Sequence, residues 1–259
     1  MLQFVINLDR SPERWTSMQC KLRRFNIQPE RISAVDGQML TNDEIKSIAQ
    51  PLTDITKIAC PRELLPGEIG CFLSHRKCWQ KLVDSNEQWA LILEDDINFS
   101  DRAENYLSNI DWIPQGVHIV QLHIWGKQWE SQIDSKRFKL ENGDELLHPC
   151  YPRALGTQAY FISKAAAKQA LLLSQKISSP VDNFLSGDFS PLSKLYPTYR
   201  LNPAVVTTTE FPSLINSDNK IKALPYSKDI KNHPLRRWIK IKLHIYRLLF
   251  TKHQTFIYK

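Results

Sequence analysis

Three consecutive acidic residues, Glu94, Asp95 and Asp96, end a short apolar run that begins at Trp89. The run is bulky and flanked by polar sequence, which predicts a buried strand. Sheets in α/β folds bind their ligands at the carboxyl ends of such strands. Three adjacent acids repel one another, and a bound cation would offset that cost. Oxygen ligands of this kind suit Mg²⁺ or Mn²⁺, with coordination positions left for phosphates. A strand that ends in a solvated acidic turn is the alternative.

A turn near the N-terminus carries two arginines. The apolar run 2–8 predicts a first strand, and Ser11 and Pro12 then supply the cap and first position of a helix whose apolar face packs on the sheet. Arg10, Arg14 and the start of this helix could contact a nucleotide phosphate, although the turn has no glycine-rich loop. Solvated surface arginines are the alternative interpretation.

Two further polar positions lie beside predicted elements. Asp36 follows a second predicted strand, residues 31–35, where an acid can accept a hydrogen bond from a ribose hydroxyl. A plain Asp-Gly turn is the alternative. Ser74 and His75 lie in a helix predicted over residues 67–83, and a lone histidine in a helix is more often structural than catalytic.

Predicted strands alternate with predicted helices, which indicates an α/β fold with a largely parallel sheet. Asn142-Gly143, between two apolar segments, predicts a hairpin that would add antiparallel strands. We expect a single Rossmann-like mixed sheet flanked by helices in a domain over residues 1–211, and a C-terminal extension over residues 212–259.

Composition narrows the function classes. The 259 residues, 42% of them hydrophobic, suffice for a sizeable core. The five cysteines include no C-x-x-C pair, so neither a disulfide framework nor a zinc site is predicted, and a reducing cytoplasm is the simplest location. Residues 1–10 do not resemble a signal peptide, and no run is apolar enough to span a bilayer. Eight of the 34 Lys and Arg residues lie in residues 231–259, which contain no acid, so the rest of the chain is nearly neutral and no nucleic-acid partner is expected.

The basic C-terminal segment has the pattern of an amphipathic helix over about residues 234–250. On a wheel of about 100° per residue, its apolar residues fill most of the circle, with Lys242 among them. The other basic residues share one arc: Arg236, Arg237, Lys240, His244 and Arg247. This pattern predicts a helix that lies in an anionic membrane surface. A helix docked on the protein's own core and a dimer contact are the alternatives.

Several short motifs occur in a specific order. They are Val5-Ile6-Asn7-Leu8 with Arg10, Glu13 and Arg14; Ala34-Val35-Asp36-Gly37; Gly70-Cys71-Phe72-Leu73-Ser74-His75 with Trp79; Leu93-Glu94-Asp95-Asp96; Gly156-Thr157 with Tyr160-Phe161-Ile162-Ser163; Pro180-Val181-Asp182; and Leu201-Asn202-Pro203-Ala204. Each motif is weak alone, but their combination over residues 1–211 resembles glycosyltransferase family 25. That family contains bacterial lipooligosaccharide galactosyltransferases and relatives that glycosylate collagen.

The resemblance implies a GT-A-type fold, a UDP-sugar donor that is usually UDP-galactose, a metal of the Mn²⁺ type (or Mg²⁺), and transfer with inversion to a growing saccharide such as lipooligosaccharide or lipopolysaccharide. The acids at 94–96 match the family's D-x-D-like motif with Glu in first place, which keeps a carboxylate but shifts its reach. The implied metal ligands are Glu94, Asp95 and Asp96. The implied donor-site residues are Asn7, Arg10, Arg14, Asp36, Ser74, His75, Glu94, Asp95, Gly156 and Thr157.

Inversion also requires a base that deprotonates the acceptor hydroxyl. Asp182, in the matching Pro-Val-Asp motif, is the first candidate, although it could instead bind the metal or the donor sugar. Asp188 and Glu210 are lesser candidates. The implied location is the inner face of the cytoplasmic membrane, as a peripheral protein.

Three other functions remain open. The first is a glucosyltransferase that uses UDP-glucose on the same acceptors, because one or two side chains can decide between two epimers. The second is a metal-dependent phosphohydrolase, although no second cluster of His and Asp ligands is evident. The third is a non-catalytic, membrane-docked binding module.

Overall fold

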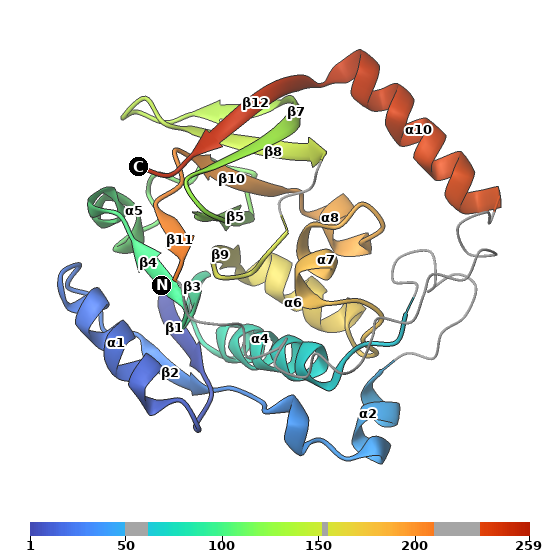
Figure 1. Cartoon of the computed structure of the whole chain (residues 1–259). Coiled ribbons are helices and arrows are strands. Elements are labelled where there is room, and N and C mark those ends of the chain that lie inside the picture. The colour runs from blue at the N-terminus through green and yellow to red at the C-terminus, as the bar shows by residue number, and fades with distance from the viewer. Residues whose placement is uncertain (50–61, 152–154, 210–233) are drawn as a thin grey trace.

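The computed structural model describes residues 1–49, 62–151, 155–209 and 234–259, which form a large sheet with helices on both faces (Figure 1). The large sheet has nine strands in the order β12-β7-β8-β10-β5-β9-β3-β1-β2, and a small sheet has the order β4-β11-β6. The strands are β1 (Leu2–Asn7), β2 (Glu30–Ser33), β3 (Trp89–Glu94), β4 (Ile97–Phe99), β5 (Ile119–Gln121), β6 (His123–Ile124), β7 (Gln128–Lys139), β8 (Glu145–Tyr151), β9 (Ala159–Ser163), β10 (Thr198–Asn202), β11 (Val206–Thr208) and β12 (Lys252–Ile257).

Helices cover both faces of the large sheet. In Figure 1, α1 and α5 lie on one side of the sheet, and α4, α6, α7 and α8 lie on the other. The helices, with two short 3-10 turns, are α1 (Pro12–Arg23), η1 (Gly37–Met39), α2 (Asn42–Ile48), α4 (Pro66–Asp84), η2 (Asp101–Ala103), α5 (Glu104–Leu107), α6 (Lys164–Leu173), α7 (Val181–Ser186), α8 (Pro191–Leu195) and α10 (Pro234–Phe250). The predicted α/β fold with a mixed sheet flanked by helices is confirmed.

The sheet is more antiparallel than the sequence predicted. β1 pairs in parallel with β2 and β3, and β5 pairs in parallel with β10. The predicted hairpin is confirmed, because β7 and β8 are antiparallel and Gly143 in their turn has a φ of +85°. β9 is antiparallel to both β3 and β5. The expectation of a largely parallel sheet is therefore wrong outside β2-β1-β3 and β5-β10, because the hairpin returns the chain so that β9 enters the sheet from the opposite end.

Alternate residues of the central strands pack into two separate cores. Along β3, Leu91 and Leu93 join the core beneath α1 and α5, whereas Ala90 and Ile92 join the core beneath α4 and α6. All four side chains are fully buried. Side chains alternate between the faces of a strand, so Glu94 continues the row of Ala90 and Ile92 toward α4. The position of each acid at the end of β3 therefore determines which face of the sheet, and which helix, its side chain lies against.

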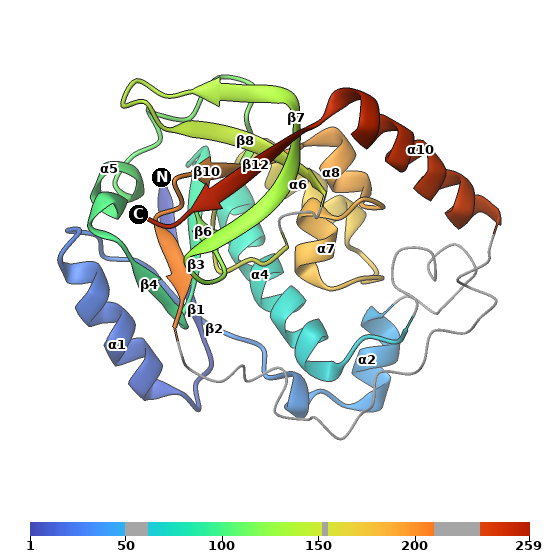
Figure 2. The ribbon, with the colours of Figure 1, turned by 45° about the horizontal axis from the view of Figure 1, so that its top comes forward.

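The predicted C-terminal helix is present as α10, with the predicted bounds. The sequence did not predict β12, which follows α10 and pairs antiparallel with β7 (Figure 2). Phe256 of β12 is fully buried beside Trp129 of β7, with ring centroids 5.1 Å apart. The C-terminal extension therefore returns to the large sheet. No helix among the described residues is long and apolar enough to cross a membrane.

Candidate active site

A pocket lies at the carboxyl ends of β1, β2 and β3, where α/β sheets bind ligands. It has an empty volume of about 750 Å³ with its open mouth included. Many of the predicted site residues meet here. The predicted site residues that line the pocket are Arg10, Arg14, Asp36, Ser74, His75, Glu94, Asp95 and Asp96.

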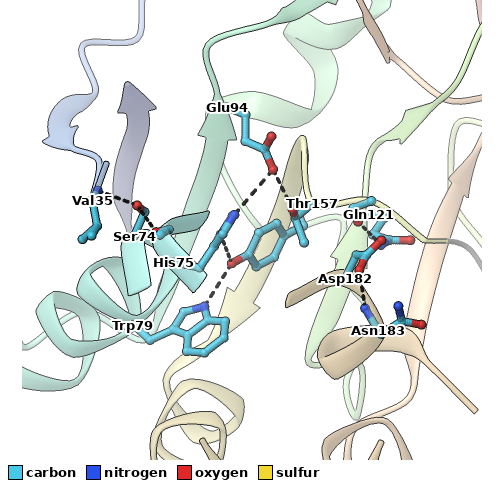
Figure 3. Close-up of polar contacts among 12 residues, drawn as sticks. Val35, Ser74, His75, Trp79, Glu94, Gln121, Thr157, Asp182 and Asn183 are labelled. Atoms are coloured by element: carbon cyan, nitrogen blue, oxygen red, sulfur yellow. Dashed lines mark hydrogen bonds and ion pairs between the residues drawn. The ribbon is translucent and has the colours of Figure 1, made fainter. Parts of the chain in front are cut away.

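Glu94, the last residue of β3, faces α4. Thr157 Oγ1 donates a hydrogen bond to Glu94 Oε1 over 2.5 Å, and His75 Nε2 lies 3.4 Å from the same oxygen. Figure 3 shows the Glu94 carboxylate between these two side chains. The hydrogen bond from Thr157 orients the carboxylate of Glu94 at the end of its strand.

Asp95 faces the opposite side of the sheet, toward α1. Asn7 Nδ2 donates to Asp95 Oδ2 over 2.6 Å, and Arg14 Nη1 lies 3.2 Å from Oδ1. Burial raises the pKa of Asp95, while Asn7 and Arg14 oppose that rise. The register explains the contact with Asn7, because Ile6 is opposite Glu94 and the next residue on each strand follows. Arg14, predicted to contact a phosphate, is thus held against an acid.

Asp96 has the least support from neighbouring donors. Its Oδ1 is buried and has no hydrogen-bond partner. Burial first, and then the charges of Glu94 and Asp95, raise the pKa of Asp96 to about 7. Two cations of α1 lie nearby: Arg14, whose charge opposes the rise, and Lys21, whose Nζ donates to the backbone oxygen of Ile97 over 2.8 Å. A buried carboxyl with a raised pKa and an open oxygen is suited to hold a cation.

Arg10 and Asp36 form an ion pair on the pocket wall, with 2.7 Å between Arg10 Nε and Asp36 Oδ2. Asp36 Oδ1 also accepts a hydrogen bond from the backbone N–H of Gln38 over 3.1 Å, so Asp36 caps the short η1 turn. Asp36 is therefore a turn residue that also lines the pocket. Gly37 packs so tightly that an added Cβ would lie 1.9 Å from the carbonyl oxygen of Pro66.

Ser74 and His75 occupy adjacent positions of α4 and do different things. Ser74 Oγ accepts from the backbone N–H of Val35 over 2.8 Å and donates to the carbonyl of Gly70 over 2.7 Å, so it ties the β2 turn to α4. His75 is fully buried, with Nδ1 2.9 Å from the hydroxyl of Tyr160. Trp79 Nε1 donates to the same hydroxyl over 3.0 Å (Figure 3). This row of aromatic side chains fixes the imidazole and directs Nε2 toward Glu94.

Gly156 and Thr157 connect the pocket to Asp182. Gly156 has a φ of +100°, and an added Cβ would lie 2.4 Å from Gln158 Oε1, so protein atoms already require glycine here. Its N–H donates to Asp182, which also accepts from the N–H of Asn183 over 2.6 Å. Burial raises the pKa of Asp182. Asp182 does not line the pocket itself, but it lies across this dipeptide from Glu94.

The lesser catalytic candidates lie elsewhere. Asp188 is 3.5 Å from Arg247 of α10 and lines a separate hollow with Asp134 and His148. The structure therefore does not bring Asp188 to the acidic pocket. Glu210 lies outside the described residues.

Sequence reasoning did not select several residues that the structure brings to the site. Cys71 lines the pocket one helical turn before His75, and the Cys-x-x-x-His spacing was an available signal. Gln121, at the end of β5, donates to the carbonyl of Gly156 over 2.7 Å. The fully buried Arg200 donates to Gln121 Oε1 over 3.0 Å, and no local sequence signal marks that contact.

Comparisons with known proteins agree with the motifs. A family model described as glycosyltransferase family 25 (LPS biosynthesis protein) matches residues 1–185. A Drosophila melanogaster protein named glycosyltransferase 25 family member is 31% identical over 186 residues, covering 70% of this chain and 29% of that protein. Human procollagen galactosyltransferase 2 is 30% identical over 186 residues, with coverage of 70% and 29%.

Other matches add two facts. A human protein named inactive glycosyltransferase 25 family member 3 is 31% identical over 188 residues, covering 70% of this chain and 30% of its own length. This chain therefore spans about 30% of the length of these curated relatives. A solved glycosyltransferase involved in the glycosylation of the major capsid of PBCV-1 has a TM-score of 0.41 at 8% identity, covering 95% of this chain and 100% of that one. On the family match over residues 1–185 and these relatives, the chain belongs to glycosyltransferase family 25.

Proposed function

We propose that this protein is an inverting, metal-dependent glycosyltransferase that moves a hexose from a UDP-sugar to an acceptor saccharide. The observation that carries the proposal is the pocket at the ends of β1, β2 and β3, which combines three carboxylates with Arg10 and Asp36. Donors of this class present a ribose, a diphosphate and a sugar, so a site for them needs acceptors for hydroxyls and positive charge for phosphates.

The acids fit a divalent cation of the Mn²⁺ or Mg²⁺ type. Asp96 offers an unpartnered buried oxygen, and Glu94 and Asp95 flank it. Oxygen ligands suit these ions. Both oxygens of Asp95 already accept from Asn7 and Arg14, so we expect Asp96 and Glu94 to be the main ligands and Asp95 to add charge. The bound cation would stabilise the negative charge that develops on the departing UDP.

The remaining pocket residues support nucleotide binding. Asp36 and Arg10 face the pocket from the turn after β2 and the turn after β1, and we propose that they contact the ribose and a phosphate. Ser74 and Asn7 hold the pocket wall through hydrogen bonds to backbone and to Asp95. His75 lines the pocket beside Glu94, with Nε2 3.4 Å from its carboxylate.

Asp182 is the proposed base. Burial raises its pKa, which brings a carboxylate closer to the pH at which a base works best. It shares the Gly156–Thr157 dipeptide with Glu94, so an acceptor hydroxyl beside Thr157 would lie between the base and the donor site. Asp182 would accept the proton as that hydroxyl attacks the sugar carbon from the face opposite the leaving group.

We base the identity of the donor sugar and of the acceptor on the names of relatives and of the family. The name of human procollagen galactosyltransferase 2 supports UDP-galactose as the donor, with UDP-glucose as the alternative. The family description as an LPS biosynthesis protein supports a lipooligosaccharide or lipopolysaccharide acceptor.

The same acceptors are lipid-linked, and α10 offers a membrane contact. Its exposed apolar side chains include Trp238, Ile241, Ile245 and Leu248, and Arg237 is exposed on the same helix. We propose that α10 holds the protein peripherally at the anionic inner face of the cytoplasmic membrane. Contacts of Leu243 and Arg247 with the hollow beside α8 would hold the helix on the domain.

The decisive experiment measures UDP release from a panel of UDP-sugars, with and without Mn²⁺, using truncated lipooligosaccharide or lactose-type acceptors. Metal-dependent turnover of one donor that requires acceptor, and that is lost in Asp96→Asn and Asp182→Asn, is expected. Turnover without acceptor would indicate the phosphohydrolase instead. Retention of activity in Asp96→Asn would contradict the metal assignment. Retention of activity in Asp182→Asn would exclude Asp182 as the base.

Calorimetric UDP binding separates the remaining outcomes. Wild-type protein that binds UDP with Mn²⁺ but turns over no donor would match the relatives named inactive and would favour a binding module. Wild-type protein that does not bind UDP at all would overturn the proposal.

A further inference from the structure

Cys71, His75 and Glu94 form a compact group on the wall of the same pocket. One potential ligand atom from each, the sulfur, an imidazole nitrogen and a carboxylate oxygen, lie within 4.8 Å of one another. Cys71 and His75 are four residues apart on α4 and so share one face of that helix. Glu94 reaches them from the end of β3. Among the described residues, the three consecutive acids do not form a group this compact.

One ring nitrogen of His75, Nε2, is available to bind a metal ion. Its Nε2 is buried and has no hydrogen-bond partner, since the contact of 3.4 Å with Glu94 does not meet hydrogen-bond geometry. An unpaired buried nitrogen of this kind is unfavourable. On the other side of the ring, the hydroxyl of Tyr160 has two acceptor lone pairs and can accept from both Trp79 Nε1–H and His75 Nδ1–H. With Nδ1 as donor, the lone pair of Nε2 is free on the side of the ring that lies 3.4 Å from Glu94.

We propose that Cys71, His75 and Glu94 bind a thiophilic divalent ion of the Zn²⁺ class, at a site distinct in chemistry from the proposed carboxylate site for Mn²⁺. A thiolate, an imidazole and a carboxylate are the three protein ligands that Zn²⁺ accepts, whereas Mn²⁺ prefers oxygen. A hydrogen bond from Nδ1–H to the Tyr160 hydroxyl would fix the tautomer and the ring orientation that a ligating histidine needs. All three residues line the pocket, so a fourth coordination position would face the ligand space.

Metal binding at this site would be linked to a proton. Burial, and the charges of Glu94 and Asp182, raise the pKa of the Cys71 thiol, so the free protein holds it protonated. A metal ligand must be the thiolate, and binding would therefore release a proton.

The site shares Glu94 with the proposed Mn²⁺ site. A Zn²⁺ ion held by Cys71 and His75 would withdraw Glu94 from the other cation, so Zn²⁺ should inhibit Mn²⁺-supported turnover. That consequence rests on the proposed function, whereas binding of the ion to Cys71, His75 and Glu94 does not.

The test is a Co²⁺ titration of the full-length, metal-free protein, because a cobalt–thiolate bond produces a charge-transfer absorption in the near ultraviolet that oxygen ligands do not. We expect one equivalent of Co²⁺ to produce this band, and Zn²⁺ to displace it. Cys71→Ser should abolish the band, and Cys20→Ser, which changes an exposed cysteine on α1, should leave it unchanged. Thermal melting of the metal-free variants confirms that each is folded.

Each outcome decides the inference. A band that survives in Cys71→Ser but is lost in Cys150→Ser would place the ion at the other compact group, Asp134, His148 and Cys150, and overturn the assignment. Absence of any band would also overturn it. His75→Gln should weaken Co²⁺ binding at least tenfold as a second check on the ligand set. Asp96→Asn should keep the band while it loses Mn²⁺-dependent turnover, so failure of the zinc site and failure of the proposed function are distinguishable.

Discussion

Glu94 and Asp95 are neighbours in the sequence, but their carboxylates contact opposite sides of the central sheet. Glu94 lies 3.4 Å from His75 of α4, whereas Asp95 lies 3.2 Å from Arg14 of α1. Strand alternation separates the two acids, and each then lies beside a different helix. Asp96 follows without a donor of its own on Oδ1. The cluster is therefore three differently supported carboxylates rather than one uniform acidic patch.

The buried carboxyl of Asp96 predicts that the metal-free protein loses stability as the pH rises. Its pKa is raised from 3.8 to about 7, mainly by burial. Below pH 4 the carboxyl is protonated in both the folded and the unfolded state. Between about pH 4 and pH 7 the unfolded chain releases this proton while the folded protein retains it, so folding is progressively penalised, by on the order of 4 kcal/mol in total.

Asp96→Asn should remove this penalty. We expect the free energy of unfolding of the variant, measured in urea with a chelator, to rise relative to wild type between pH 5 and pH 8. Asp111→Asn, which changes an exposed carboxylate, is the control and should show no such pH-dependent difference. If the difference in unfolding free energy between Asp96→Asn and wild type is the same at pH 5 and at pH 8, Asp96 ionises normally.

Metal affinity should depend on pH for the same reason. A cation and a proton compete for the Asp96 carboxylate, so the Mn²⁺ dissociation constant should rise about tenfold for each unit that the pH falls below about 7, and level off above it. Calorimetry between pH 5.5 and 8.5 measures this slope. Glu94 and Asp95 would still bind weakly in Asp96→Asn, with a shallower pH dependence. Equal slopes in the two proteins would exclude Asp96 as the group that competes with the proton.

Much of the pocket could be predicted from sequence because strand order and alternation position it. Acids at the end of a buried strand, and polar residues after the two neighbouring strands, had to meet at one edge once β1, β2 and β3 were parallel. Asn7 was predicted from the family motif, and the register of β1 with β3 explains its contact with Asp95.

The parts that were not predicted depend on contacts between distant segments. Cys71 reaches Glu94 only because α4 packs across the end of β3, and neither local sequence contains that relation. β12 reads Lys-His-Gln-Thr-Phe-Ile, with little apolar pattern, and it is a strand because the edge of β7 is available to pair with it. Asp188 had a suitable residue type and sequence neighbourhood, but the structure places it beside Arg247 of the C-terminal helix and away from the acidic pocket.

Gly156 should be intolerant of a side chain for two separable reasons. Its φ of +100° is strained for any other residue, and a Cβ would lie 2.4 Å from Gln158 Oε1 and 2.5 Å from His123 Nε2. Gly116 has a similar φ of +83°, but a Cβ there would meet no atom within 4 Å. The comparison of Gly156→Ala with Gly116→Ala therefore separates crowding from backbone strain.

We expect both variants to lose about 1 kcal/mol or more from backbone strain, and Gly156→Ala to lose roughly 1–3 kcal/mol more from overpacking. Urea unfolding measures both. Because Gly156 precedes Thr157, which orients Glu94, Gly156→Ala should also weaken Mn²⁺-dependent UDP binding, and Gly116→Ala should not. Equal losses of stability in the two variants would show that the turn at Gly156 relaxes around the added methyl group.

The exposed face of α10 predicts binding to anionic vesicles. Trp238 is 59% exposed, Leu248 69% and Leu249 68%, on a helix that also exposes Arg237 and Lys240. Apolar side chains that enter the lipid interface each contribute on the order of 1 kcal/mol, and the basic residues add an attraction that salt screens. Full-length protein should therefore sediment with phosphatidylglycerol vesicles, less with phosphatidylcholine vesicles, and less in high salt.

The test uses substitutions on the surface of α10 in the full chain, so that the fold is preserved. Truncation before α10 would also delete β12 and its buried Phe256, so substitution in the full chain is the cleaner change. Serine at Trp238, Leu248 and Leu249 together should weaken vesicle binding at least tenfold, since about 3 kcal/mol of interfacial burial is removed. Serine at Leu172 and Leu195, exposed leucines on α6 and α8, is the control and should leave binding unchanged. Equal binding by both variants and wild type would assign the exposed face of α10 to another partner, such as a second copy of the chain, which analytical ultracentrifugation would then detect.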